Sequence, residues 1–195
     1  MILIIGRTGS GKDYLAQELA KSGLTQVLSY TTRPQRYPEE NTHIFIDKVT
    51  ASIICDKIAT TTINGYEYFA TRRQMEENDV YIIDPAGTYE LLNNCPFVPF
   101  VICYVTADNE QRRMKAVGRG SDSSKEAEVF LKRNASENEQ FSEFEAMLID
   151  PVRLAAFRKQ HPNIGDLILV RNDYEPTTIQ GAAQRLLGAL SERYA

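Results

Sequence analysis

Tryptophan is absent from this chain of 195 residues, and it holds only three cysteines and two histidines. The cysteines are odd in number and form no C-x-x-C pair, which excludes a disulfide scaffold and predicts the reduced thiols of a cytoplasmic protein. Long apolar runs are missing as well. The apolar stretch at residues 1–5 has no basic leader and falls far short of the ~20 residues that cross a bilayer. The sequence therefore predicts neither secretion nor a membrane anchor.

An excess of positive charge is also missing, because 22 Lys and Arg residues stand against 26 Asp and Glu residues, for a formal charge of −4 at pH 7. This balance argues against a general nucleic-acid-binding protein. Hydrophobic residues make up 43% of the chain and charged residues 25%, which excludes a disordered or collagenous protein. A chain of this length buries roughly 70% of its unfolded surface, so its core requires no disulfide or metal.

One segment reverses the overall charge. Residues 112–133 hold seven basic side chains against three acidic ones. The basic side chains are Arg112, Arg113, Lys115, Arg119, Lys125, Lys132 and Arg133. The segment is a candidate anion-binding element, and a solvated helix face is the alternative.

Apolar runs alternate with helical patterns from end to end, which is typical of βαβ units and of a parallel sheet covered on both faces. We expect strands at residues 1–5, 26–29, 80–83, 98–105 and 167–170. Helices are expected at residues 12–21, 71–78, 86–94, 109–117, 125–144, 151–160 and 177–193. The predicted fold class is therefore α/β.

The pattern changes between the second and third strands. Three short segments, residues 43–46, 58–63 and 66–70, are rich in Thr, Ile, Tyr and Phe, and Asn64-Gly65 makes a tight turn between the last two. We predict a small antiparallel insert beside the main sheet. No repeat, low-complexity tract or flexible linker divides the chain, so residues 1–195 are expected to form a single domain.

A glycine-rich loop follows the first strand directly. It consists of Gly6, Arg7, Thr8, Gly9, Ser10, Gly11, Lys12 and Asp13, and a helix follows. Glycines at this spacing let backbone N–H groups turn inward around a phosphate, and the helix adds the positive end of its dipole. Lys12 is placed to reach the β- and γ-phosphates. These eight residues are the candidate ATP-binding loop, and a simple turn is the alternative.

Two carboxylates are candidate magnesium ligands. Asp13 follows Lys12 at the position where a Ser or Thr hydroxyl usually binds Mg²⁺, and its charge predicts a stricter magnesium requirement. Asp84 follows the third strand, where an acidic side chain would stand beside the phosphates at the carboxyl edge of the sheet. The alternative for Asp84 is a polar residue that simply ends a strand before Pro85.

A second candidate anion site follows the second strand, where Arg33 and Arg36 stand three residues apart in a loop rich in hydroxyls. Arginine suits two-pronged recognition of phosphate. The segment Ser-Tyr-Thr-Thr-Arg-Pro-Gln-Arg from Ser29 to Arg36 resembles the acceptor-binding loop of the guanylate kinase family, S-x-T-T-R-P-x-R. The resemblance continues in the right order along nearly the whole chain.

This resemblance implies a P-loop NTPase fold with a parallel sheet flanked by helices. It divides the domain into a core of residues 1–30, 80–117 and 145–195, an acceptor-binding insert of about residues 31–79 and a basic helical lid of about residues 118–144. It also implies ATP- and Mg²⁺-dependent transfer of a phosphoryl group to a nucleoside monophosphate. GMP or dGMP is the first expectation for the acceptor, and the protein is expected to be a cytoplasmic monomer or homodimer.

The family's functional residues carry over where the motifs match. Lys12 would act in catalysis with Arg119 and Arg133 of the lid, which would hold the transferring phosphoryl group. Asn172 would contact the donor adenine. The acceptor-binding residues would be Ser29, Arg33, Arg36, His43, Tyr68 and Asp84. These roles agree with the chemistry, because phosphoryl transfer requires mainly alignment, charge neutralisation and exclusion of water.

Several positions depart from the family pattern. Ala59 and Ile82 stand where guanylate kinases hold carboxylates near the guanine, and a site without these acceptors forfeits roughly 10⁴-fold discrimination. The candidates to compensate are Thr60, Thr61, Thr62 and Glu67. His43 takes the place of a Tyr, with a solvent-facing strand end as the alternative, and His161 is expected at the surface.

Two other functions stay open. The lost carboxylates are compatible with a P-loop kinase that acts on a modified-nucleotide or non-nucleotide phosphate. The arginine pair is compatible with a catalytically inactive guanylate kinase-like module that binds a phosphorylated protein, although the retained donor-side and lid residues argue against lost catalysis. Residues 141–160 are assigned no chemistry and are expected to form core or an oligomer contact.

Overall fold

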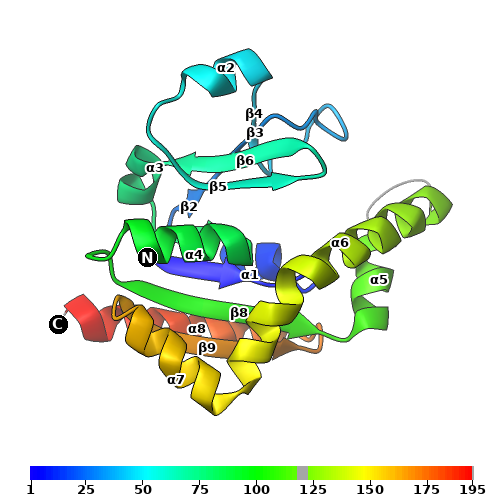
Figure 1. Cartoon of the computed structure of the whole chain (residues 1–195). Helices are drawn as coiled ribbons and strands as arrows, with labels where there is room; N and C mark the ends of the chain where they lie inside the picture. Colours follow the sequence, from blue (N-terminus) through cyan, green and yellow to red (C-terminus); the bar gives the residue numbers. More distant parts are fainter. Residues whose placement is uncertain (118–122, 195) are drawn as a thin grey trace.

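The computed structural model describes residues 1–117 and 123–194 and places a five-stranded parallel sheet at the centre of the molecule (Figure 1). The strands, in the spatial order of the sheet, are β2 (Gln26–Val27), β7 (Val80–Ile82), β1 (Ile2–Ile5), β8 (Phe100–Ala107) and β9 (Ile164–Asn172). All four pairings between neighbours are parallel. The α/β fold class and all five predicted strands are confirmed.

The first strand lies in the middle of this sheet. It pairs with β7 on one side and with β8 on the other, and its four residues are fully buried. A strand that is covered on both faces needs a continuous apolar sequence rather than an alternating one. The run Ile-Leu-Ile-Ile meets this requirement and delivers the following glycine-rich loop to the carboxyl edge of the sheet.

Helices cover both faces of the sheet. On one face α1 (Lys12–Ala20) and α8 (Pro176–Tyr194) pack with Ile2 and Ile4 of β1. On the other face α4 (Pro85–Asn94), α6 (Ser123–Ile149) and α7 (Pro151–Gln160) pack with Leu3 and Ile5. Successive side chains of a strand point to opposite faces, so one short strand anchors both cores.

The insert between β2 and β7 is a second sheet with the order β4-β3-β6-β5. Its strands are β3 (Tyr30–Thr31), β4 (Ile44–Phe45), β5 (Lys57–Ile63) and β6 (Tyr66–Thr71), with the short helices α2 (Lys48–Ile53) and α3 (Arg72–Glu77) beside them. The predicted antiparallel character holds for two of the three pairings. It is wrong for β3 and β4, which run parallel because the chain makes a long excursion between them before it pairs again.

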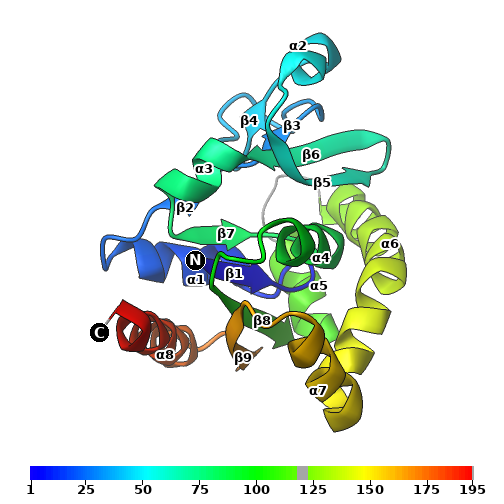
Figure 2. The same cartoon turned by 60° about the vertical axis from the view of Figure 1, so that its left-hand side comes forward.

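Helix α5 (Asn109–Val117) has its expected bounds, whereas α6 extends to Ile149, beyond the predicted end at residue 144. A core boundary at residue 145 therefore falls inside a helix. Arg119 of the predicted lid lies outside the described residues. Figures 1 and 2 show the insert at one end of the molecule, with α6 rising along one side toward the β5–β6 hairpin.

Residues 141–160 form part of the core, which confirms the first of the two expectations for this segment. The aromatic rings of Phe144 and Phe157 lie 6.3 Å apart and both are buried. His161 packs against Phe157 with ring centroids 4.9 Å apart and is 3% exposed, so its predicted surface position is wrong. Within the described ranges, no helix has the length and apolar character that a membrane crossing requires.

Two phenylalanines provide a matched test of this core. Phe144 is 1% exposed and touches the rings of Tyr89, Tyr104 and Phe157, whereas Phe97 is 96% exposed. We expect Phe144→Ala to lower the free energy of unfolding by about 3–5 kcal/mol, because it removes a large buried side chain and leaves a cavity. Phe97→Ala should change it by less than about 0.5 kcal/mol. Urea denaturation measures both, and similar losses would contradict the assigned core.

Candidate functional site

The glycine-rich loop joins the end of β1 to the start of α1. Gly9 and Gly11 have φ angles of 79° and 99°, which only glycine adopts without strain. A Cβ atom on Gly11 would also lie 2.3 Å from Nδ2 of Asn172. The backbone therefore passes so close to its neighbours that glycine is required at this position.

Asn172, at the end of β9, braces this loop from behind. It is 3% exposed, its Nδ2 donates to the carbonyl of Ser10 at 2.8 Å, and its Oδ1 accepts from the N–H of Tyr174 at 2.8 Å. Tyr174 in turn donates its hydroxyl to the carbonyl of Gly9 at 2.7 Å. Each end of the Asn172 amide thus has a partner inside the protein, and its contact with a donor adenine stays a prediction.

Lys12 and Asp13 open α1 beside the loop. Lys12 Nζ donates to the carbonyl of Arg7 at 2.9 Å, and Lys12 also lines a cavity between the loop and the insert. Asp13 is exposed in the first turn of the helix, where its charge is favourable near the positive end of the helix dipole.

A cavity of about 310 Å³ lies between the glycine-rich loop, the insert and α6. Nine of its lining residues were predicted for the site, and they come from all three parts of the fold. The insert and the segment just before it contribute Ser29, Arg33, Arg36, His43 and Tyr68, the loop contributes Thr8 and Lys12, and α6 contributes Arg133. Asp84 also lines it, from the end of β7. Residues that are distant in the sequence therefore meet in one space, next to the candidate phosphate loop.

The arginine pair is organised by a buried glutamate that sequence reasoning missed. Glu40 Oε1 and Oε2 lie 2.8 and 3.1 Å from the guanidinium nitrogens of Arg33, and Oε2 also accepts from the backbone N–H of Arg36 at 2.7 Å. Arg33 Nε further donates to the hydroxyl of Tyr68 at 3.2 Å. Burial opposes ionisation of Glu40, yet the hydrogen bonds from Arg33 and Arg36 lower its pKa to about 2. Glu40 thus stays ionised and neutralises part of the pair.

His43 lies in the cavity wall rather than facing solvent. Its Nδ1 is 2.9 Å from the Ser29 hydroxyl, and its ring meets Tyr68 edge-on with centroids 5.4 Å apart. Burial, followed by the charges of Arg33 and Arg36, lowers the pKa of His43 from 6.5 to about 4, so the ring is neutral at pH 7.

Asp84 ends β7, as its alternative interpretation predicted, and its role as a magnesium ligand stays a prediction. It lines the cavity, and its Oδ1 caps α4 by accepting the N–H of Gly87 at 2.7 Å. Burial raises the pKa of its carboxyl group. Among the described residues, no group of three or more His, Cys, Asp or Glu side chains forms a ready-made metal site. Magnesium in phosphotransferases is held by one or two carboxylates together with substrate phosphates, which this arrangement permits.

Part of the cavity lining is apolar. Ala59, Ile63, Ile82 and Phe141 line it, as the missing carboxylates at positions 59 and 82 suggested. Of the four residues expected to compensate, only Thr61 reaches the cavity lining. Glu67 instead lies 2.5 Å from Lys57 Nζ as an ion pair, and the N–H of Thr60 is bound by Glu90.

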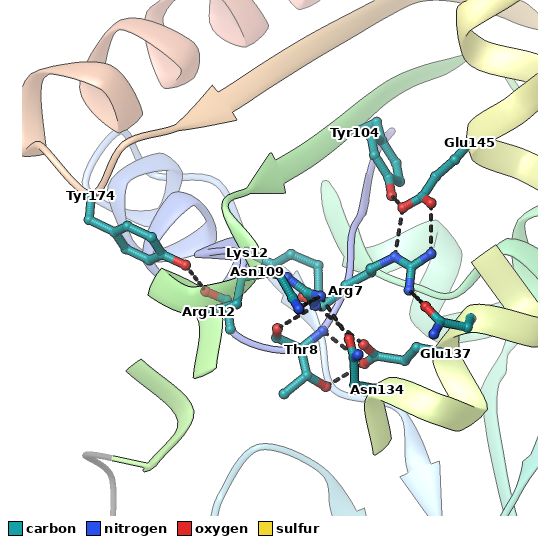
Figure 3. A network of polar contacts seen from close by, with 12 residues as sticks. Arg7, Thr8, Lys12, Tyr104, Asn109, Arg112, Asn134, Glu137, Glu145 and Tyr174 are labelled. Carbon is teal, nitrogen blue, oxygen red and sulfur yellow. Dashed lines mark hydrogen bonds and ion pairs between the residues drawn. The ribbon is translucent and has the colours of Figure 1, made fainter. Parts of the chain in front are cut away.

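Helix α6 is attached to the loop by a polar network that the sequence did not reveal (Figure 3). Arg7 forms a two-pronged ion pair with Glu145, with both N–O distances 2.7 Å. Arg112 donates to the carbonyl of Thr8 at 3.1 Å and to Asn134 at 2.8 Å. Glu137 accepts the N–H of Thr8 at 2.8 Å. The sequence signal for this network was two acidic side chains, Glu137 and Glu145, eight residues apart on one helix. Their partners lie more than 100 residues away in the chain.

Comparisons with known proteins agree with this geometry at the level of the fold. No family model matches the sequence, and no curated protein matches it. The structure is similar to that of guanylate kinase from Anaplasma phagocytophilum, with a TM-score of 0.54 over 99% of this chain and 85% of that one. The chain has a guanylate kinase-like fold. Sequence identity in the match is 16%, so the likeness concerns the fold alone.

The brace behind the guanylate kinase-like loop can be tested at Gly11. Gly11→Ala places a Cβ against Asn172 at a positive φ, and we expect it to lower the free energy of unfolding by about 2–4 kcal/mol. Gly181→Ala is the matched control, because it lies within α8 with open space around it and should stabilise the protein by about 0.5–1 kcal/mol. Thermal and urea denaturation measure both. Equal effects would contradict the close approach of Asn172.

The position of His43 predicts a pH dependence of stability. Its pKa is about 4 in the folded protein and 6.5 ordinarily, so the unfolded chain binds the proton first as the pH falls. Stability should therefore fall between pH 7.5 and pH 5 by up to about 2 kcal/mol from this residue. His43→Gln should remove this part of the decline in urea denaturation. An unchanged pH profile in the variant would show that His43 is not desolvated.

Proposed function

We propose that this protein is an ATP- and Mg²⁺-dependent phosphotransferase whose acceptor is a nucleoside monophosphate. One observation carries the proposal: Lys12 of the glycine-rich loop and the Arg33–Arg36 pair of the insert line the same cavity of about 310 Å³. A donor phosphate on the loop and an acceptor phosphate on the arginine pair would then face each other. The guanylate kinase-like fold supports this arrangement.

The chain supplies groups for the alignment and much of the charge neutralisation that phosphoryl transfer requires. The amides of the loop hold the donor phosphates, and Lys12 neutralises charge on the group in transit. Arg36, His43 and Tyr68 orient the acceptor phosphate from the opposite wall. Arg133 reaches the cavity from α6, and together with Arg119 it is proposed to hold the transferring group. Alignment and charge neutralisation of this kind supply most of the rate enhancement in such reactions.

Magnesium is proposed to be held by Asp13 and Asp84 together with the phosphates. When bound, the ion would neutralise negative charge on the phosphates. Asp84 faces the cavity with one carboxylate oxygen already used as a helix cap, and Asp13 stands in the turn next to Lys12.

We propose that the nucleobase of the acceptor substrate is one that needs few hydrogen-bond acceptors from the protein. GMP and dGMP are the first acceptors to test because of the fold. The apolar lining by Ala59, Ile63 and Ile82 favours a second candidate, a kinase for a modified-nucleotide or non-nucleotide phosphate. Buried donors of a guanine would be left unpaired beside these side chains, which costs roughly 1–3 kcal/mol for each group.

The functional parts are proposed to follow the family pattern. The insert of about residues 31–79 would bind the acceptor, residues 118–144 would form the lid, and the remaining chain would form the core. Because α6 continues without a break to Ile149, the lid and the core share one helix. We place the protein in the cytoplasm on the basis of its three free cysteines, of which Cys95 and Cys103 are buried.

A coupled ADP-release assay with ATP, Mg²⁺ and a panel of ribo- and deoxynucleoside monophosphates tests the proposal. In this assay Lys12→Ala should lower kcat by at least about 100-fold, since it removes charge stabilisation. Arg36→Ala should mainly raise the acceptor KM, by about 10-fold or more. Arg36 is the better choice of the two acceptor arginines, because removing Arg33 would leave buried Glu40 poorly compensated.

The matched control is Arg73→Ala, an exposed arginine of α3 whose ion pair joins it to Glu77 of the same helix. This variant should leave kcat and KM unchanged. A chain that releases no ADP with any acceptor, yet binds a phosphorylated peptide through Arg36, would be an inactive binding module. Equal, small effects of Lys12→Ala and Arg36→Ala would contradict the assigned roles.

A further inference from the structure

Helix α6 contacts the glycine-rich loop through a carboxylate. Glu137 Oε1 accepts the backbone N–H of Thr8 at 2.8 Å and also the hydroxyl of the same residue. Both residues line the cavity of about 310 Å³ that holds Lys12. A carboxylate oxygen therefore binds an amide of the loop in the manner that an anionic ligand would.

The second oxygen of Glu137 indicates what kind of group the loop is holding. Oε2 is buried and receives no hydrogen bond from any residue in the ranges 1–117 and 123–194. The nearest cation to it is Arg112, whose Nη1 lies 3.6 Å away. Oε1 of Glu137 is hydrogen-bonded to Thr8, and Oε2 is shielded from solvent. This geometry suits a carboxylate that the loop binds as an anion better than a base that accepts a proton from a substrate.

Neighbouring contacts hold Glu137 in this position. Arg7, one residue before Thr8, is bound to Glu145 and to Asn138, and Arg112 is bound to Asn134 (Figure 3). Four residues of α6 belong to this network: Asn134, Glu137, Asn138 and Glu145. Their spacing along the helix places them on one face of it. The contact of Glu137 with the loop is thus part of an extended interface and not an isolated surface contact.

This arrangement conflicts with a bound donor nucleotide. A terminal phosphate on the loop would bring negative charge beside a carboxylate that is only partly screened by solvent, and like charges at short range repel. Arg133 lies one helical turn before Glu137 and also lines the cavity. Release of Glu137 from Thr8 would therefore remove a repulsive charge while an attractive one stays nearby on the same helix face.

We propose that Glu137 is an internal competitor of the donor nucleotide, which occupies the loop at Thr8 in the free protein and is displaced by the terminal phosphate of ATP. This inference rests on the proposed phosphotransferase function. It assigns to Glu137 the role of setting donor affinity and of coupling donor binding to the release of α6 from the loop. In this scheme Glu137 must leave Thr8 before the cavity can hold both the donor and the acceptor.

Calorimetry with the full-length protein tests the competition. ADP and a non-hydrolysable ATP analogue are titrated with Mg²⁺, without acceptor, into wild type, Glu137→Gln, Glu137→Ala and Glu139→Gln. If the contact between Glu137 and Thr8 is present in 90–99% of the free molecules, its loss should tighten nucleotide binding by about 10- to 100-fold. The gain should be larger for the triphosphate than for ADP. Glu139 is exposed two residues further along α6, and its variant should bind like wild type.

A second readout does not depend on affinity. In protein labelled with ¹⁵N-threonine, the amide signal of Thr8 reports its hydrogen bond to the carboxylate. The signal should shift upfield in Glu137→Ala, and it should move in wild type when the ATP analogue is added. Thermal melting of each variant confirms that it is folded, and Glu137→Gln keeps the shape of the side chain if the alanine variant is unstable.

The outcomes separate this inference from the proposed function. Tighter binding in both Glu137 variants together with a ligand-sensitive Thr8 signal supports the competition. Nucleotide binding that is unchanged within twofold in both variants overturns the competition and leaves the phosphotransferase standing. Failure of wild type and both variants to bind either nucleotide at millimolar concentration overturns both proposals.

Discussion

The close packing of the glycine-rich loop against the protein behind it is the constraint on which the rest of the site depends. At Gly11 the backbone comes so near to Asn172 that no side chain fits, and the hydrogen bond from Asn172 to Ser10 ties the loop to the end of β9. The buried strand β1 fixes the other end of the loop. A phosphate-binding surface made of backbone groups is useful only when its shape is held in this way, because the amides cannot adjust one by one.

In the cavity, the positive charges of the arginine side chains are partly offset by nearby carboxylates. Arg33 is buried, and an unpaired buried guanidinium would be costly, so Glu40 accompanies it. His43 stays neutral beside the two arginines. The cavity wall formed by the insert thus carries less positive charge than its sequence suggests, and Arg36, with its side chain 46% exposed, is the more accessible of the two arginines. The carboxylate of Glu137 has the same balancing effect at the glycine-rich loop.

Most elements were predictable from the sequence, whereas their pairing was not. The five core strands and α5 were placed correctly. Strand β4 was also predicted, within residues 43–46, but β3 was not, and the parallel pairing of the two follows from a loop excursion that no local signal records. The extension of α6 adds residues 145–149, of which Met147 and Leu148 are buried in the core shared with α4 and α7.

The sequence by itself determined the order of β1, glycine-rich loop and α1, the arginine pair and the apolar character at Ala59 and Ile82, since these are properties of residues and their spacing. Tertiary structure decided which groups meet. Asn172 lies behind Ser10 across 162 residues of chain, and Glu137 binds Thr8 across 129. Contacts between such distant positions arise from the packing of whole helices and strands, whose relative placement is a property of the folded core and leaves no mark in local sequence.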